Sequence, residues 1–375
     1  MQILFITGTR ADVGKLTPYI HAAEEVNRSK INIIITGLHM VKKFGETYKE
    51  VKKKFSNAKI FKFKNQIEKE DLALSLHITI KKFNELISII KPTLIVVHGD
   101  RIEALAGSIV GSFNNIRVCH VEGGDLSGTI DESIRHSITK LSHIHFPHDL
   151  KAKEILLRLG ELEKSIFIGG SHINWLNKEK MLPSFSAFKK RYDFNFNDFA
   201  ISLIHPVTSE IGYMKDWVDK YFKTLIKSNH NYLILYPNSD PGSQIIIDKI
   251  NEIKKQKTKR FRIIPTIRHE FFLSALKNAK FIIGNSSTGI FEAPIFGTYV
   301  IDIGTRQNNR VKSIKNYINT DYEPKNIFNA IKNHKKINSN VKKNIFKKYN
   351  PYNVFKNFLI KKKYLNVSIQ KNFNV

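Results

Sequence analysis

The stretch that decides the fold reads Val96-Val97-His98-Gly99-Asp100-Arg101, where a buried β-branched strand ends in a cluster of ionisable residues. A second short strand ends in the same way at His120-Val121-Glu122-Gly123-Gly124-Asp125, and Asp131-Glu132-Ser133-Ile134-Arg135-His136 follows it. Ligands of an open parallel sheet bind just beyond the carboxyl ends of its strands. We therefore expect these carboxylates, arginines and histidines at one edge of a sheet. Helix capping alone is the alternative, but ionisable groups gathered at such an edge favour a catalytic site.

A glycine turn follows the first predicted strand, which runs from Met1 to Thr7. The turn reads Gly8-Thr9-Arg10-Ala11-Asp12, and we expect a helix to begin near Lys15. Such a turn lets backbone N–H groups and the helix dipole face an anion, and the planar guanidinium of Arg10 suits phosphate. Its spacing differs from G-x-G-x-x-G, so it does not indicate a dinucleotide site.

Strands and helices alternate along the rest of this first half. Further strands are predicted at 33–35, 59–63, 94–97, 118–121, 144–146 and 166–168. A long helix is predicted from Leu72 to Ile90, where apolar residues recur at helical spacing. This alternation predicts a parallel sheet with right-handed crossovers. The polar, aromatic-dotted segment from Asn174 to Asp198 is interpreted as a linker into the second half.

A second α/β pattern begins with the strand Phe199–Ile204, which stops at His205-Pro206-Val207-Thr208. Its later strands are predicted at 232–235, 261–264, 281–283 and 299–303, and its helices at 214–226, 243–255 and 268–277. From Asn308 to about Tyr364 the lysine-rich chain is interpreted as amphipathic helices on the outside. The predicted domains are 1–170 and 171–355, followed by a C-terminal segment, 356–375.

The second half contains a candidate phosphate site at Gly284-Asn285-Ser286-Ser287-Thr288-Gly289, between a strand and a helix. Two hydroxyls and backbone N–H groups at a helix N-terminus can hold an anion without a lysine. A serine N-cap is the alternative, but one serine would satisfy it. Glu292 follows about one turn later, where it can accept hydrogen bonds from ribose hydroxyls, and Arg306 offers a second guanidinium after the strand 299–303.

Composition sets wider limits. The 375 residues carry a formal net charge of +28, from 61 Lys and Arg against 33 Asp and Glu. This excess suggests an anionic partner, although scattered lysines among Asn and Ile also fit an AT-rich genome. Cys119 is the single cysteine, and Met1–Thr7 reads as a strand rather than a signal peptide. No apolar run approaches the roughly 20 residues that span a bilayer. We therefore expect a cytoplasmic protein without membrane insertion.

A histidine run, His143-x-His145-x-x-His148, has a spacing that metal ligands also use. Its alternation with Ile144 and Phe146 is typical of a strand, and no thiolate or carboxylate is spaced to complete a site. We expect a structural or edge role for these histidines and no metal.

The motifs together resemble the hydrolysing UDP-N-acetylglucosamine 2-epimerases of sialic acid synthesis. The resemblance runs from Met1 to about Tyr322 and returns at Asn350-Pro351-Tyr352. It is carried by Gly8-Thr9-Arg10-Ala11-Asp12, His98-Gly99-Asp100-Arg101-x-Glu103-Ala104, His120-Val121-Glu122-Gly123-Gly124-Asp125-x-Ser127-Gly128-Thr129-Ile130-Asp131, Ser133-Ile134-Arg135-His136, Gly284-Asn285-Ser286-Ser287-x-Gly289-Ile290-x-Glu292 and Gly304-Thr305-Arg306-Gln307. A departure at Gly170-Ser171-His172, where the family pattern has a proline near the serine, concerns local loop shape.

The resemblance implies a glycosyltransferase-B-like fold, with two doubly wound Rossmann-like domains facing a cleft. It also implies that the C-terminal segment 356–375 packs back on the first domain. It implies conversion of UDP-N-acetylglucosamine and water into N-acetylmannosamine and UDP, through a 2-acetamidoglucal. No cofactor and no metal are expected, because nothing is oxidised and because arginines and helix termini neutralise the phosphates. A homodimer or homotetramer is expected.

The resemblance also implies residue roles. Glu122 or Asp100 is expected to be the base, with Asp131 and Glu132 relaying protons and His205 acting on the leaving phosphate. A carboxylate base is expected to need a raised pKa, supplied by neighbouring acids and burial. The residues expected to bind the substrate are Arg10, Asp12, Arg101, Arg135, Asn238, Ser286, Ser287, Glu292 and Arg306.

Three other functions are compatible with parts of the sequence. A sister branch, which acts on a GDP- or UDP-linked 2,4-diacetamido-2,4,6-trideoxyglucose for legionaminic acid, has similar motifs. A glycosyltransferase on the same fold would need an acceptor. Nucleic-acid binding fits the net charge, but the basic residues are dispersed and acidic clusters occupy the sheet edges that would meet phosphate. We therefore expect a nucleotide-sugar substrate and no nucleic acid.

Overall fold

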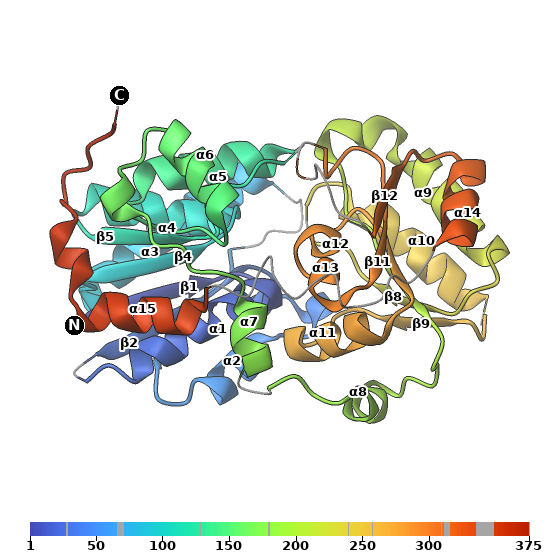
Figure 1. Cartoon of the computed structure of the whole chain (residues 1–375), viewed down its shortest axis with the longest axis horizontal. Helices are drawn as coiled ribbons and strands as arrows, with labels where there is room; N and C mark the ends of the chain where they lie inside the picture. Colours follow the sequence, from blue (N-terminus) through green and yellow to red (C-terminus); the bar gives the residue numbers. More distant parts are fainter. Residues whose placement is uncertain are drawn as a thin grey trace. The chain divides into compact units, whose positions relative to one another are not determined.

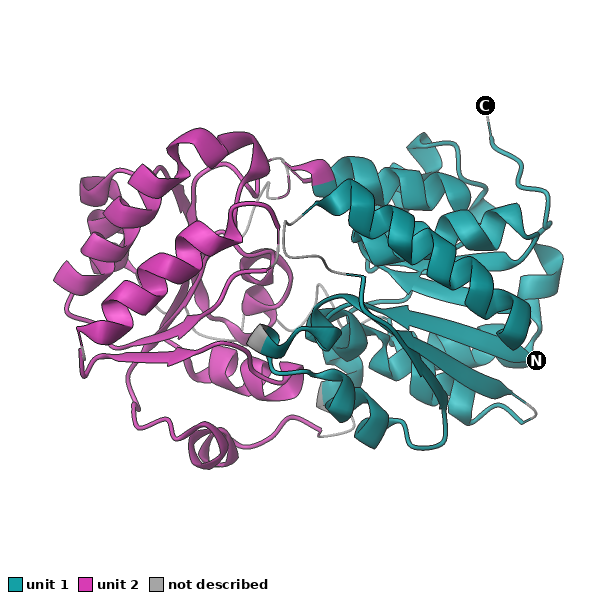
Figure 2. Cartoon of the chain, turned by 180° about the vertical axis from the view of Figure 1, so that it is seen from behind, with its two compact units in different colours: residues 1–125, 131–180, 346–375 teal, residues 126–130, 181–345 magenta. Residues whose placement is uncertain are grey.

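The computed structural model of the chain describes residues 1–27, 29–65, 71–127, 129–178, 181–238, 240–256, 258–308, 310, 316–334 and 349–374. The chain divides into two compact units (Figure 2). The first unit holds residues 1–125, 131–180 and 346–375, and the second holds residues 126–130 and 181–345.

The first unit is built on a parallel sheet with strand order β3-β2-β1-β4-β5-β6 (Figure 1). Its strands are β1 (Gln2–Thr7), β2 (Lys30–Ile35), β3 (Lys59–Lys62), β4 (Leu94–His98), β5 (Arg117–Val121) and β6 (Ile144–Phe146). The order reverses between β1 and β4, which pair directly. Such a topological switch point is where doubly wound sheets bind ligands.

Helices cover both faces of this sheet. They are α1 (Arg10–Glu24), α2 (Tyr48–Lys54), α3 (Leu72–Ile90), α4 (Ile102–Phe113), α5 (Ile130–Leu141), α6 (Leu150–Arg158), α7 (His172–Lys178) and α15 (Pro351–Ile360). Successive side chains of a strand point to opposite faces. Accordingly Ile3 and Phe5 of β1 join a core with α1 and α15, whereas Leu4 and Ile6 join a core with α3 and α4. Burial on both faces explains why β1 reads as a continuous apolar run.

The second unit repeats the same topology, with strand order β12-β11-β10-β7-β8-β9. Its strands are β7 (Ala200–Leu203), β8 (Tyr232–Leu235), β9 (Phe261–Ile264), β10 (Phe281–Gly284), β11 (Tyr299–Ile303) and β12 (Tyr317–Thr320). Its helices are α8 (Phe185–Tyr192), α9 (Ile211–Lys227), α10 (Ser243–Lys255), α11 (His269–Asn278), α12 (Thr288–Phe291), α13 (Ala293–Phe296) and α14 (Pro324–Asn333). The switch point here lies between β7 and β10. The predicted pair of doubly wound Rossmann-like domains is therefore confirmed.

Some predicted elements were wrong in detail. The first helix begins at Arg10 rather than near Lys15, and 166–168 makes an isolated bridge from Ile166 to His145 instead of a strand. The segment 174–198 was interpreted as a linker, but it contains most of α7 and the whole of α8. The lysine-rich segment after 308 contains the strand β12 as well as helices, and its part from 335 to 348 lies outside the described residues.

The unit boundaries differ from the predicted domain boundaries at 171–180 and 346–355, which belong to the first unit. The reason is that α7 and α15 both pack on α1. Within the described residues, the structure has no helix with the length and apolar character needed to cross a bilayer.

Candidate active site

The switch point of the first unit centres on His98, the last residue of β4. Nδ1 of His98 lies 3.3 Å from Oδ1 of Asp12, and Nε2 lies 3.0 Å from Oε2 of Glu122. The same carboxylate oxygen accepts a hydrogen bond from Nζ of Lys15 at 2.7 Å. Asp12 and Lys15 come from α1, and Glu122 follows β5. Three neighbouring strand ends therefore bring two acids and two bases into one network.

The turn after β1 owes its shape to Asp12. Its Oδ2 accepts from the backbone N–H groups of Gly8 and Thr9, at 3.2 and 2.9 Å, and the Thr9 hydroxyl accepts from the Asp12 N–H. This reciprocal capping box starts α1 at Arg10. The sequence predicted that the turn would offer its backbone N–H groups to an anion. At Gly8 and Thr9 that prediction was wrong, because Asp12 already occupies them.

Glu122 adopts a left-handed backbone conformation, with φ of 61°. For a residue with a side chain this conformation costs on the order of 1–3 kcal/mol, and it persists only where the surroundings impose it. Here the Glu122 N–H donates to the carbonyl of Phe146 at 3.0 Å, and the carboxylate is held by Lys15 and His98. These contacts hold the Glu122 carboxylate at the switch point.

Electrostatics make this network strongly ionic. Burial opposes the charge of His98, but the carboxylates of Glu122 and Asp12 outweigh it and raise the pKa of His98 to about 9. Both ring nitrogens face carboxylates, as an imidazolium requires. Burial also opposes the charge of Glu122, yet Lys15 and His98 hold the pKa of Glu122 well below its ordinary value. His98 likewise outweighs burial and lowers the pKa of Asp12.

These shifts correct one sequence expectation. A carboxylate base was expected to have a raised pKa, but the pKa of Glu122 is lowered. Asp100, the other candidate base, pairs with the buried guanidinium of Arg135, which also donates to the carbonyl of Asp125 at 3.0 Å. Burial opposes the charge of Arg135, but Asp100, Asp125 and Asp131 outweigh it and raise its pKa. Asp131 therefore lies within electrostatic reach of the Asp100–Arg135 pair.

The other predicted residues of the first unit are placed as follows. Glu132 lies in the first turn of α5, with an oxygen 3.8 Å from Nε2 of His136. Arg101 directs its Nε toward the buried carboxylate of Glu103 at 3.5 Å. Arg10 makes a bidentate pair with Glu50, at 3.1 and 2.7 Å, so a phosphate at Arg10 would compete with that carboxylate.

The switch point of the second unit centres on Asn285, which is 1% exposed. Its Oδ1 accepts from the N–H of His205 at 2.6 Å, and its Nδ2 donates to the His205 carbonyl at 2.9 Å. Nδ1 of His205 accepts from the N–H of Asn238 at 3.0 Å. In the neutral ring the hydrogen must therefore sit on Nε2. This arrangement fixes His205 as a hydrogen-bond donor through Nε2.

The remaining predicted residues of the second unit lie at Asn285 or in the chain that follows it. Arg306 donates to the Asn285 carbonyl at 3.4 Å and approaches Asp240, which itself accepts from the side chain of Asn238. Ser286 Oγ accepts from the N–H of Thr288 at 3.4 Å, so this serine partly fulfils the capping alternative. The helix it opens, α12, is only four residues long, and Ser287 precedes it. Glu292 is buried between α12 and α13. A short helix contributes little dipole, so any anion here would depend on hydroxyls and N–H groups.

Sequence reasoning left three residues of the first unit out of the site. Lys15 lies three residues after Asp12, a spacing that places both on one face of α1 and that could have revealed it. His98 was noticed at the sheet edge but given no role. His148 lies 3.5 Å from Asp125 and 3.2 Å from Asp149. Burial opposes its charge, but these aspartates raise the pKa of His148 to about 9.

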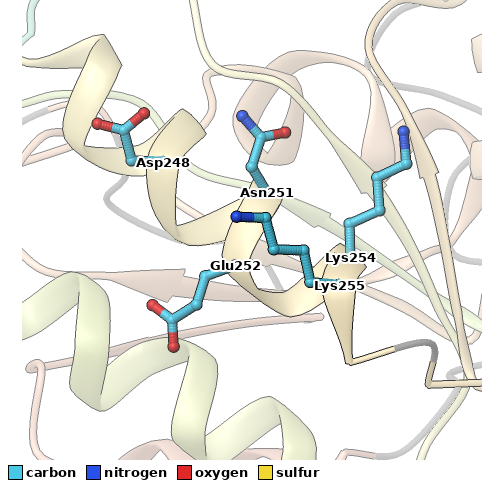
Figure 3. A pocket seen from close by; sticks show the side chains of 5 residues that line it. All are labelled: Asp248, Asn251, Glu252, Lys254 and Lys255. Atoms are coloured by element: carbon cyan, nitrogen blue, oxygen red, sulfur yellow. The ribbon is translucent and has the colours of Figure 1, made fainter.

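The pocket in Figure 3 lies outside both switch points. It is lined by Asp248, Asn251, Glu252, Lys254 and Lys255, all from α10. These side chains carry both signs of charge along the half of α10 that leads to β9, and no predicted site residue is among them. We do not assign this pocket to the active site.

Comparison with known proteins adds independent findings. A family model described as UDP-N-acetylglucosamine 2-epimerase matches residues 21–356. A relative from Neisseria meningitidis, named UDP-N-acetylglucosamine 2-epimerase, is 45% identical over 330 residues, 88% of this chain and 86% of the relative. A relative from Legionella pneumophila, named UDP-N,N'-diacetylbacillosamine 2-epimerase (hydrolyzing), is 34% identical over 334 residues, 85% of each chain.

Solved structures agree on the fold. The structure of Methanocaldococcus jannaschii UDP-GlcNAc 2-epimerase, in complex with UDP-GlcNAc and UDP, superposes with a TM-score of 0.78. The match covers 97% of this chain and all of that chain, at 23% sequence identity.

Proposed function

The chain belongs to the UDP-N-acetylglucosamine 2-epimerase family, and we propose that it is a hydrolysing enzyme that converts UDP-N-acetylglucosamine and water into N-acetylmannosamine and UDP. The observation that carries the proposal is the partly buried network of Asp12, Lys15, His98 and Glu122 beside the Asp100–Arg135 pair. Charged side chains with shifted pKa values gather at catalytic sites, and doubly wound sheets bind their ligands at the switch point. The relative that is 45% identical bears the name of this activity.

The reaction consists of an elimination and a hydration. A carboxylate takes the proton from carbon 2, the bond from carbon 1 to the phosphate oxygen breaks, and UDP leaves with that electron pair. Water then adds across the double bond of the 2-acetamidoglucal, with a hydroxyl at carbon 1 and a proton on the opposite face of carbon 2. The proton at carbon 2 is weakly acidic, so stabilising the departing phosphate is as important as the base.

The base is proposed to be Glu122 or Asp100, and their surroundings differ. The Glu122 carboxylate is paired with the cations Lys15 and His98, which lower its pKa. The low pKa favours the ionised form and weakens Glu122 as a base. Asp100 pairs with the guanidinium of Arg135. Asp131 and Glu132, in the first turn of α5, are proposed to relay protons and to assist hydration. Comparing Glu122→Gln with Asp100→Asn in a single turnover would separate the two: the variant that binds substrate but forms no glucal lacks the base.

The second unit is proposed to hold the nucleotide. Nε2 of His205 is set to donate to the leaving phosphate oxygen, because its Nδ1 already accepts from Asn238. Ser286, Ser287 and Arg306 would bind the diphosphate. Glu292 would accept hydrogen bonds from the ribose hydroxyls, and Asn238 would contact the nucleotide or the sugar. Arg10, Asp12, Arg101 and Arg135 are proposed to orient the substrate from the first unit.

A second substrate is favoured by one observation. The relative that is 34% identical is named for UDP-N,N'-diacetylbacillosamine and for hydrolysis. The same elimination and hydration would serve that 2,4-diacetamido-trideoxy sugar, whether carried by UDP or GDP. The two substrates differ at carbons 4 and 6, which the proposed acid–base groups do not have to touch.

Product analysis tests the proposal. The protein would be incubated separately with UDP-N-acetylglucosamine and with the UDP- and GDP-linked diacetamido sugars, and products would be followed by proton NMR and nucleotide chromatography. Release of UDP together with free N-acetylmannosamine is the expected result. Accumulation of UDP-N-acetylmannosamine without free sugar would show a non-hydrolysing epimerase. Turnover of the diacetamido sugars alone would show that a diacetamido sugar nucleotide, and not UDP-N-acetylglucosamine, is the substrate.

A further inference from the structure

The last residues of the chain bind along the first unit through a series of backbone contacts. We call residues 367–374 the C-terminal strap. Nε of Arg117 donates to the Val367 carbonyl at 2.8 Å, and Nε2 of His143 bonds the Ile369 carbonyl at 2.9 Å. The N–H of Asn374 donates to the carbonyl of Gly160 at 2.8 Å. These contacts tie the strap to the starts of β5 and β6 and to the loop after α6.

Lys371 is the charged residue that the strap inserts into the unit, with 13% of its side chain exposed. Its Nζ donates to the carbonyls of Thr139 and Ser142, at 2.7 and 2.5 Å, and to Oε2 of Glu161 at 2.8 Å. Thr139 and Ser142 lie at the C-terminal end of α5, where a cation is favourable because it faces the negative end of the helix dipole. Lys371 therefore caps α5 from outside the helix.

Glu161 makes this cap a buried ionic centre. Its side chain is 2% exposed, and Oε2 also contacts Nε2 of His145 at 2.8 Å. Burial opposes the charge of Lys371 and lowers its pKa to about 8, although Glu161 favours the charged form. A salt bridge buried this deeply is weak support for a role in stability, since desolvation offsets much of the attraction. Its location suggests a role in positioning.

Two residues of α5 contact the candidate base Asp100 or the groups around it. Arg135 lies one turn before Thr139 and pairs directly with Asp100. The hydroxyl of Thr139 lies 3.1 Å from Nδ1 of His120, and Nε2 of His120 bonds the carbonyl of Gly99 at 2.7 Å. Thr139 thus contacts Lys371 through its carbonyl and, through His120, the residue that precedes Asp100. A shift of α5 would move both contacts.

We propose that Lys371 is a positioning residue for the reaction: by capping α5 it holds Arg135 and His120 in the places that fix Asp100. The proposal rests on the proposed function, because the consequence of a displaced Asp100 is slower proton transfer at carbon 2. Lys371 acts through α5 rather than on the substrate.

The decisive variant combines Lys371→Met with Glu161→Gln. Replacing both charges avoids leaving Glu161 buried without its cation, so the double variant is expected to fold. We expect its kcat to fall by about tenfold or more, since small misplacements of a catalytic group are costly. We also expect a larger kinetic isotope effect from deuterium at carbon 2, because proton removal becomes more rate-limiting. Lys371→Arg should keep kcat within about twofold. Lys361→Met serves as the control, because Lys361 is exposed and lies at the end of α15, outside the strap.

Two results would overturn the proposal. One is a double variant whose kcat stays within about twofold of the parent chain; the other is a lower kcat with an unchanged isotope effect, which would mean only fewer active molecules.

Amide hydrogen exchange supplies a readout that needs no turnover. In the double variant, the amides of 98–101 and 130–141 should exchange faster, and the exchange rates of 281–303 should be unchanged. If the proposed function is wrong, the parent chain itself will release no N-acetylmannosamine. The hydrogen-exchange result would still decide whether Lys371 positions α5.

Discussion

Replacing Glu122 by glutamine tests the electrostatics of the candidate site directly. The pKa of His98 is about 9 because Glu122 and Asp12 outweigh the effect of burial. Glutamine keeps the shape of the side chain and removes its charge, 3.0 Å from Nε2 of His98. An opposite charge at such a distance shifts a pKa by about 1–3 units, or roughly 1.4 kcal/mol per unit. The pKa of His98 should therefore fall to between about 6 and 8 in the variant.

Histidine side-chain NMR as a function of pH measures this shift. His148 provides an internal control, since its pKa is also about 9 but is set, against burial, mainly by Asp125 and Asp149, with Glu122 a smaller influence. Its pKa should move by less than about one unit. A His98 that still titrates within about half a unit of 9 in the variant would refute the reasoning, because Glu122 would then not be the charge that holds the imidazolium.

Further expectations concern turnover and stability. Glu122→Gln should lower turnover by about a hundredfold or more while UDP binding, measured by calorimetry, persists; an unchanged rate would exclude a catalytic role. His205→Ala should lower turnover by at least about tenfold without loss of circular dichroism, since a donor to the leaving phosphate is removed; a normal rate would make this histidine structural. Lys15→Met should cost about 1.5–3 kcal/mol of unfolding free energy in urea titrations at pH 7, because a charged hydrogen bond in a partly buried pair is lost; no change would mean that the pair is not formed in solution. Gly284→Ala should cost at least about 2 kcal/mol or prevent folding, because φ is 138° and an added Cβ would lie 2.0 Å from a carbonyl oxygen of β7; a stable variant would contradict the β7–β10 geometry. Finally, the pKa of His98 in the folded chain, about 9, lies above its ordinary 6.5, so its stabilisation is fully present below about pH 6.5 and is lost as pH rises through 9. This stabilisation amounts to about 3.4 kcal/mol, and a Glu122→Gln chain should lose less over the same range.

The sequence predicted the sheets well because their strands are buried on both faces. A continuous apolar run of strand length, as in β8 or β10, has few other interpretations. The long helix α3 was predicted from apolar residues that recur at helical spacing. The strand β12 was missed because it lies at a sheet edge, is partly exposed and reads Tyr-Ile-Asn-Thr within a lysine-rich segment.

The site was predictable only in part. Residues that follow strands were found, because the carboxyl ends of parallel strands meet at one edge. Their pairings were not, since they join residues far apart in the chain: Arg10 pairs with Glu50, and Lys15 reaches Glu122 across 107 positions. The lowered pKa of Glu122 follows from those pairings, so the sequence alone could not give its direction.

The central claim is that a carboxylate of the first unit removes the hydrogen at carbon 2 of the sugar. It is tested most directly by running the reaction with UDP-N-acetylglucosamine in deuterium oxide and determining the isotope at carbon 2 of the released N-acetylmannosamine by NMR. One solvent-derived deuterium is expected at that carbon. Product that retains its original hydrogen there would contradict it.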